Sequence, residues 1–146
     1  MLLVDQLPRN PSEDDLFASA MRALSAGNVE LALSQSKQLI QRDSGDPYAL
    51  ILAADCFNFY GKAQEGLGLI QAAVAASDHA PIFSLLQSQQ LHRLQRSDQA
   101  LDCLREARLR HPNDSGLLLQ QFELLCFLHQ DSEARSLVES SRDQLI

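Results

Sequence analysis

One spacing limits what this chain can fold into more than any other feature. Four small residues, Ala32, Gly66, Ala100 and Ala134, lie 34 positions apart, each near the start of a predicted helix. A fixed period of about 20–50 residues is typical of repeat proteins, in which each repeat packs only on its neighbours. A small side chain in every copy lets two paired helices cross near the short end of the roughly 8–10 Å range of axis separations. The spacing therefore predicts four copies of one helix pair.

Larger apolar residues keep the same period, with Ser36 as the clear exception. Fifteen positions before the small residue, the four copies have Phe17, Ile51, Leu85 and Leu119. Nine positions before it they have Ala23, Phe57, Leu91 and Leu125. Four positions after it they have Ser36, Ile70, Leu104 and Val138. Because an unrelated sequence would not keep several columns in step, the repeat is stronger evidence than a match to any single short motif.

Capping and turn signals divide the chain into eight helices of about 14 residues. Asp46 followed by Pro47 is typical of a helix start, and Gly27 and Gly61 fall in the turns. No segment alternates strictly between apolar and polar residues, so no sheet is predicted. The expected helices cover about residues 13–26, 29–42, 47–60, 63–76, 81–94, 99–110, 115–128 and 132–144. We predict an all-α fold, an α-solenoid of antiparallel helix pairs, with a closed helical bundle as the lesser alternative.

The first twelve residues lie outside the repeats and form an apolar leader segment. Leu3 and Val4 are among its apolar residues, and Pro8 and Pro11 prevent a continuous helix. Two interpretations stay open: an unstructured start, or an apolar strap that docks on this chain or on a neighbouring copy. The predicted domains are the leader, 1–12, and the repeat domain, 13–146, with units of about 13–46, 47–80, 81–114 and 115–146.

Composition excludes several classes of partner. The net charge of −7 opposes binding to nucleic acid, and no run approaches the roughly 18 apolar residues that a membrane helix needs. Asp5 interrupts the apolar start and no basic residues precede it, so we expect no secretory signal. Three widely spaced cysteines fit reduced thiols better than a disulfide framework. We therefore predict a cytoplasmic protein that does not insert into a membrane.

The repeats resemble the tetratricopeptide repeat (TPR) family over about residues 13–146. The third unit matches best, through Ala100, Leu104, Ala107 and Pro112, although the family's characteristic tryptophan is absent. The second unit matches through Leu50, Ala53, Phe57, Tyr60 and Ala73, with Gly66 in place of the usual alanine. The resemblance implies a right-handed superhelix with a concave groove, lined by the first helix of each pair, that binds peptides or protein surfaces.

The same resemblance implies which side chains line that groove. The partner-binding residues would be Phe17, Met21, Tyr48, Ile51, Asp55, Asn58, Phe59, Leu85, Gln89, His92, Arg93, Leu119, Glu123 and Phe127. One branch of the family binds carboxylate termini with a clamp of cations, and the corresponding positions here hold Phe17, Met21, Ile51, Asp55 and Leu85, which lack those cations. The predicted set is mainly apolar and suits an extended apolar peptide or an amphipathic helix, with Asn58, Gln89, His92 and Arg93 as orienting contacts.

No motif in the sequence indicates catalysis. The four histidines are spread singly, without the spacing of zinc ligands, and neither a phosphate-binding loop nor a nucleophile elbow is present. We therefore predict no enzyme activity, no cofactor and no metal. Arg105, Arg108 and Arg110 gather near a helix C-terminus, where cations are favoured, and docking of an acidic partner is the second interpretation of this group.

The sequence therefore predicts a non-enzymatic protein-interaction module. One alternative is a type III secretion-type chaperone for a secreted client. Another is the N-terminal TPR domain of a longer enzyme, such as a sulfotransferase or glycosyltransferase. A homodimer could form through the leader or through the C-terminal unit, where no further helix follows to cover the apolar side chains of Leu124, Leu125, Leu128, Leu137 and Val138.

Overall fold

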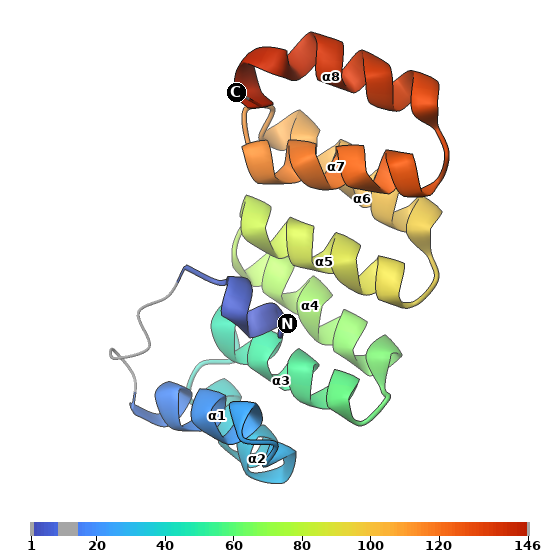
Figure 1. Ribbon diagram of the computed structural model, residues 1–146. Helices are drawn as coiled ribbons and strands as arrows, with labels where there is room; N and C mark the ends of the chain where they lie inside the picture. The colour runs from blue at the N-terminus through green and yellow to red at the C-terminus, as the bar shows by residue number, and fades with distance from the viewer. Residues whose placement is uncertain (1, 9–14, 146) are drawn as a thin grey trace. The chain divides into compact units, whose positions relative to one another are not determined.

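The computed structural model describes residues 2–8 and 15–145 (Figure 1). In this part of the chain there are eight α-helices, one short 3₁₀ helix and no strand, which confirms the predicted all-α array of helix pairs. The elements are η1 (Leu3–Gln6), α1 (Asp15–Ser25), α2 (Val29–Arg42), α3 (Pro47–Phe59), α4 (Ala63–Ala76), α5 (Pro81–Arg93), α6 (Ser97–Arg110), α7 (Ser115–Phe127) and α8 (Asp131–Leu145).

The 34-residue period is visible in the helix limits themselves. Each limit of α2 recurs 34 and 68 residues later in α4 and α6, and α3, α5 and α7 are related in the same way. The three helices of the second set end one residue earlier than predicted. At Tyr60 the backbone N–H reaches both Cys56 O and Phe57 O, so the last turn tightens and the α-helix stops at Phe59. The predicted start of the first helix lies outside the described residues.

Contacts divide the chain into two compact units, residues 1–78 and 79–146. In the first unit α1 pairs with α2, α3 packs on both α2 and α4, and α1 also contacts α3. In the second unit α5 pairs with α6, α7 packs on both α6 and α8, and α5 also contacts α7. Each unit therefore holds two adjacent first helices: α1 with α3, and α5 with α7.

The column of small residues lies inside the helix pairs. Ala32 and Ala100 are fully buried, Ala134 is 4% exposed, and Gly66 is also buried. Ser36, the polar exception among the apolar columns, is buried too, and its hydroxyl donates to Leu33 O at 2.8 Å within the same helix. A short hydroxyl that is satisfied locally can therefore replace an apolar side chain at this position.

A second column of the period forms the turn inside each helix pair. Gly27, Gly61, Gln95 and His129 are 34 residues apart and all have positive φ, between 58° and 85°. The residue after each of them donates its backbone N–H to a carbonyl five positions earlier, as Asn28 does to Ala23 O at 2.8 Å. This is the Schellman closure of a helix C-terminus. The four turns thus share one geometry, although only two of them contain glycine.

The expectation of an uncovered apolar end was wrong for most of the residues concerned. Leu124 and Leu125 are 3% and 0% exposed, and Leu137 is 9% exposed. The reason is that α7 packs between α6 and α8, so its leucines face those helices. Leu128 and Val138 are half-buried. A second copy is therefore not needed to cover this part of the chain.

Candidate peptide-binding face

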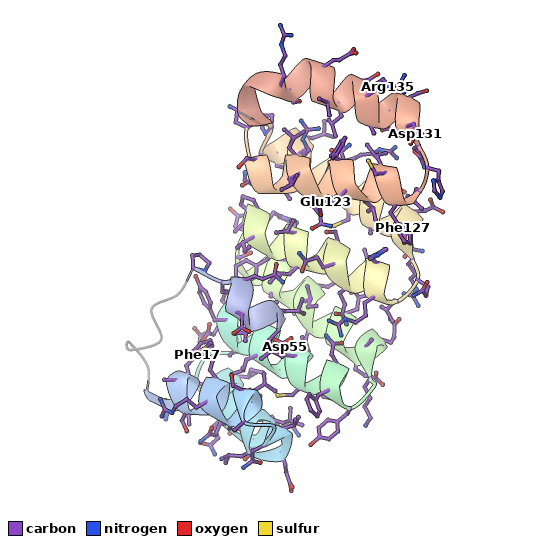
Figure 2. The ribbon with its side chains drawn as sticks, in the orientation of Figure 1. Phe17, Asp55, Glu123, Phe127, Asp131 and Arg135 are labelled. Carbon is purple, nitrogen blue, oxygen red and sulfur yellow. The ribbon has the colours of Figure 1, made fainter. Side chains whose placement is uncertain are left out.

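The leader docks on its own chain. η1 lies against α3, and the backbone N–H groups of Leu3 and Val4 donate to the two carboxylate oxygens of Asp55, each at 2.8 Å (Figures 1 and 2). The Leu3 and Val4 side chains are each 2% exposed, and Asp55 is 3% exposed. Of the two interpretations of the leader, the structure therefore shows the strap.

The chemistry of this contact follows from the geometry of a short helix. The first N–H groups of a helix have no carbonyl within it to bond, so those of Leu3 and Val4 are free to meet an acceptor outside. A buried carboxylate is stable only where hydrogen bonds replace its water, and a charged acceptor makes these bonds stronger than neutral ones. Asp55 and the leader therefore satisfy each other, while the two aliphatic side chains are withdrawn from water.

The central part of α3 is buried on all sides as a result. Eight consecutive residues, from Ala49 to Cys56, are buried. A surface helix normally buries one stripe and exposes the other. Here α1, α2, α4 and η1 all contact α3. The Asp55 carboxylate would otherwise lie on the remaining face of this helix, where the groove was predicted.

In the first unit, much of the predicted groove is closed. Phe17 and Ile51 are 1% and 0% exposed, and Asp55 is held by the leader. The half-buried members are Met21, Tyr48 and Asn58, and Phe59, at the end of α3, is 62% exposed. The sequence did not identify Leu3 and Val4 as the residues that fill this face, although their apolar character was the available signal.

In the second unit, the equivalent face of α5 and α7 is open. Leu119 is 49% and Phe127 is 58% exposed, and Glu123 between them is exposed (Figure 2). Of the predicted residues on α5, Arg93 is exposed, and Leu85, Gln89 and His92 are half-buried.

Two contacts join α5 to α7 at this open face. The Gln89 side-chain amide donates to Gln120 Oε1 at 3.4 Å. Further along, the His92 and Phe127 rings meet edge to face, with centroids 4.7 Å apart and planes at 89°. His92 Nδ1 also lies 2.8 Å from Ser97 Oγ, which fixes the ring orientation. These contacts hold the face in a defined shape before any partner binds.

The arginine group belongs mainly to the internal structure of the second unit. The Arg105 guanidinium donates to both oxygens of Glu133, at 2.6 and 2.7 Å, and to Asp102 at 3.3 Å. These hydrogen bonds raise the pKa of Arg105, and the bond to Glu133 makes the largest contribution. Arg108 donates to Gln121 Oε1 at 3.0 Å. Arg105 and Arg108 therefore brace α6 against α8 and α7.

The cysteines differ in their surroundings. Burial raises the pKa of the Cys56 thiol to about 11, with a further contribution from the Asp55 charge. Burial also raises the pKa of Cys103 to about 11, assisted by Glu106. Cys126 is exposed, and all three thiols are free. Within the described residues, no group of three or more His, Cys, Asp or Glu side chains is placed to hold a metal ion.

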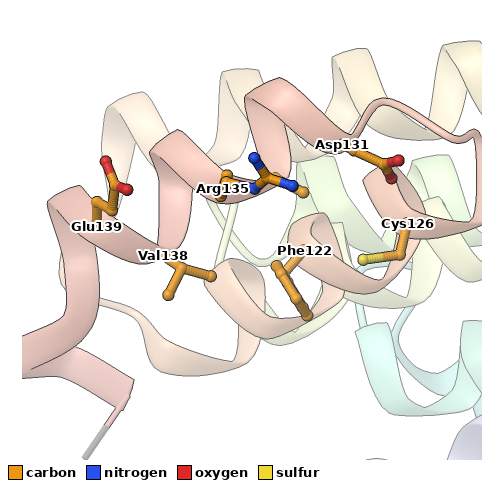
Figure 3. Close-up of a pocket in the computed structure, with 7 residues that line it drawn as sticks. Phe122, Cys126, Asp131, Arg135, Val138 and Glu139 are labelled. Carbon is orange, nitrogen blue, oxygen red and sulfur yellow. The ribbon is translucent and has the colours of Figure 1, made fainter.

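A depression of about 460 Å³ lies between α7 and α8, away from the predicted groove residues (Figure 3). Its lining is mostly apolar, with charged groups on α8. The lining residues are Phe122, Cys126, Asp131, Ala134, Arg135, Val138 and Glu139. The sequence signal for this hollow was the four-residue spacing that places Phe122 and Cys126 on one side of α7.

Solved structures show the same arrangement of helix pairs. The chain is similar to YrrB, a TPR protein with an unusual peptide-binding site, at a TM-score of 0.63 and 21% identity over 86% of this chain and 64% of YrrB. It is similar to TTC0263, a thermophilic TPR protein in Thermus thermophilus, at a TM-score of 0.69 and 17% identity over 97% of this chain and 77% of TTC0263. It is also similar to a MamA protein, at a TM-score of 0.68 and 10% identity over 88% of this chain and 70% of MamA.

The chain has the tetratricopeptide-repeat fold. This confirms the resemblance inferred from the 34-residue columns, and it does so at the level of fold because the identities are all low. No protein-family profile matches the sequence, and no curated protein matches it. The TPR helices that the structure describes include none long and apolar enough to cross a membrane.

Proposed function

We propose that this TPR protein is a non-enzymatic interaction module that binds an apolar peptide segment or an amphipathic helix on the first helices of its pairs. The docked leader carries the proposal. It is an apolar segment, distant in sequence, that buries two aliphatic side chains on α3 and donates two backbone N–H groups to Asp55. A first helix of this array can therefore bind such a segment, and the α5 and α7 face offers apolar surface to another.

Of the residues predicted from the sequence, we assign to direct partner contact those with the most accessible side chains. They are Phe59, Arg93, Leu119, Glu123 and Phe127. The peptide-binding site of the similar protein YrrB agrees with this kind of function. No contact in the described residues favours the secretion-chaperone role or a link to an enzyme.

Nuclear magnetic resonance on the full chain tests the proposal. Apolar extended peptides and amphipathic helical peptides are added to ¹⁵N-labelled protein, and the shifted amides are mapped. We expect the shifts to cluster on the exposed face of α5 and α7. Shifts confined to the outer surfaces of α6 and α8, or no binding by any peptide, would contradict the proposal.

Two matched variants sharpen this test. Phe127 and Leu109 are both large, apolar and exposed, at 58% and 84%, but Phe127 is on α7 and Leu109 is on α6. We expect Phe127→Ala to weaken binding of the best peptide about five- to tenfold, because exposed aromatics contribute strongly to interfaces. Leu109→Ala should leave the affinity unchanged. Equal effects of the two variants would indicate nonspecific apolar binding.

A homodimer through an exchanged leader is the alternative assembly. It would need Leu3 and Val4 to leave Asp55 of their own chain and bind Asp55 of a second copy. Light scattering of the full chain over a range of concentrations tests this alternative, since the monomer mass is 16.2 kDa. We expect the monomer. A constant mass of twice that value would favour the exchanged leader.

We further propose a reducing compartment, the cytoplasm, because Cys56, Cys103 and Cys126 are all free thiols. Thiol trapping in cells, followed by mass spectrometry of the denatured protein, should find all three alkylated. A mixed disulfide at Cys126 in most molecules would contradict this assignment.

A further inference from the structure

The leader site has a counterpart in the second unit. Ile51 and Asp55 lie four residues apart on α3, and 68 residues later Leu119 and Glu123 lie four residues apart on α7. Each of these helices is the first helix of the later pair in its unit, and it contacts the first helix of the earlier pair: α3 contacts α1, and α7 contacts α5. In each unit, therefore, an aliphatic side chain precedes a carboxylate by one turn, at the same position in the repeat.

The two pairs differ in what covers them. Ile51 and Asp55 are 0% and 3% exposed, and the carboxylate accepts two backbone N–H groups from the leader. Leu119 is 49% exposed, and Glu123 is exposed (Figure 2). The residue at the same position on α5 is Gln89, a neutral amide already bonded to Gln120. Glu123 is thus the open carboxylate of this column.

We propose that Leu119 and Glu123 form a second binding site for an apolar segment, occupied by a partner protein. The ligand has two adjacent aliphatic residues, like Leu3 and Val4, and donates their backbone N–H groups to the Glu123 carboxylate. The occupant is foreign because the leader of this chain already donates the same two groups to Asp55. This inference rests on the proposed function and names the ligand chemistry of one site.

The size of the site fits a short segment. The Gln89–Gln120 contact lies next to Leu119, and the His92–Phe127 contact lies at the end of α7. At a rise of about 1.5 Å per residue, the stretch of α7 from Leu119 to Phe127 is roughly 12 Å long, which is the length of about three to four extended residues. Glutamate has one more methylene than aspartate, so its carboxylate reaches a segment that lies farther from the helix axis.

The test uses the leader itself as the probe. A synthetic peptide of residues 2–8, LLVDQLP, acetylated and amidated, is titrated into the ¹⁵N-labelled full chain. A matched peptide has methyl groups on the backbone nitrogens of its second leucine and its valine, which removes the two donors but keeps the side chains. We expect the first peptide to shift the amides of Leu119 and Glu123, and the methylated one to bind at least about tenfold more weakly.

Protein variants identify the acceptor. Glu123→Ala should weaken the unmodified peptide at least about tenfold, equivalent to about 1.4 kcal/mol, because charge-assisted hydrogen bonds are lost. Glu139→Gln removes an exposed carboxylate of α8 outside the site and should change nothing. The amides of Leu3 and Val4 report on the leader, and their signals should not move.

The outcomes separate this site from the general proposal. If the peptide binds on the α5 and α7 face and neither Glu123→Ala nor backbone methylation changes its affinity, the Leu119–Glu123 site is overturned while the proposed interaction module is retained. Shifts of Leu3 and Val4 with Glu123 unmoved would show that the peptide exchanges with the leader at Asp55, which also overturns it. A dimer that forms without peptide and is lost in Glu123→Ala would make a second copy the occupant and overturn the foreign partner. Absence of all binding would overturn the site and the general proposal together.

Discussion

The two units are built from the same repeat, yet they treat their first helices differently. In the first unit the central part of α3 is enclosed on all sides, and its Asp55 carboxylate is occupied by the leader. In the second unit α7 buries one stripe and leaves Leu119, Glu123 and Phe127 exposed. The difference does not arise from the repeat, which supplies an aliphatic–acidic pair in both. It arises from the leader, which precedes the repeat, so occupancy is decided outside the repeated sequence.

A second contrast lies in the turns. Both turns inside the helix pairs of the first unit have glycine at the positive-φ position, whereas those of the second unit have Gln95 and His129. Positive φ is available to glycine without penalty and is uncommon for residues with a side chain. The turns inside the helix pairs of the second unit therefore carry backbone strain that the corresponding turns of the first unit avoid.

The largest expected effect is at the leader site. Asp55→Ala would leave two buried N–H groups without their acceptor, and we expect it to lower the free energy of unfolding by about 2–4 kcal/mol. Urea denaturation measures this change, and hydrogen exchange at Leu3 and Val4 should become much faster. Glu139→Ala, on the exposed surface of α8, is the control and should alter stability by less than about 0.5 kcal/mol. If both variants behaved alike, the leader contact would not stabilise the first unit.

Substitutions in the small column test whether the two units are packed alike. Ala32 and Ala100 are both fully buried at equivalent positions, one in each unit. Ala32→Leu and Ala100→Leu should each lower the free energy of unfolding by about 1–3 kcal/mol through overpacking. Thermal denaturation measures the stability of both variants, and chemical denaturation provides an independent check. An unchanged melting temperature for either variant would mean that the helix crossing in that unit is not tight.

The Cys56 thiol predicts a pH dependence for the first unit. Its pKa in the folded chain is about 11, against 9.0 for an unperturbed cysteine, so between these values the folded state keeps a proton that the unfolded state releases. Stability is therefore full below about pH 9 and falls as the pH rises toward 11. The expected loss from this thiol is about 1 kcal/mol at about pH 10. Cys56→Ala should flatten this part of the profile, while Cys126→Ala should not.

The smallest effects concern the turns. Gly61→Ala should lower the free energy of unfolding by about 1 kcal/mol, since an added methyl group meets nothing within 4 Å and only the backbone conformation is strained. Gln95→Gly should raise it by about 0.5 kcal/mol, because relief of strain exceeds the added entropy of the unfolded chain. Denaturant titration of the pair resolves the opposite signs. A loss of stability in Gln95→Gly would mean that its side chain outweighs its backbone strain.

Much of the fold could be predicted from the sequence because it depends on local signals and on one period. The limits of α2 and α4 agree with those predicted from caps and turns, and the small column is buried as expected. Helix ends were one residue too long where the last turn tightens, which depends on hydrogen-bond geometry that the residue types do not reveal.

The site was harder to predict because its decisive contact is distant along the chain. Asp55 is 51 and 52 residues from the two amides that it binds, and nothing near it in sequence indicates that an acidic residue at mid-helix is buried. The leucines of the C-terminal unit were expected to be uncovered, and here too the error came from contacts between helices that composition does not show.

The bond between Asp55 and the leader has a consequence for evolution. The carboxylate accepts hydrogen bonds from Leu3 and Val4 only through backbone N–H groups, which every residue type except proline possesses. Most mutations in such a segment would change how well its side chains are buried and leave both bonds in place. A ligand held in this way can drift widely in sequence while it continues to bind, so its relatives would be hard to find by sequence similarity.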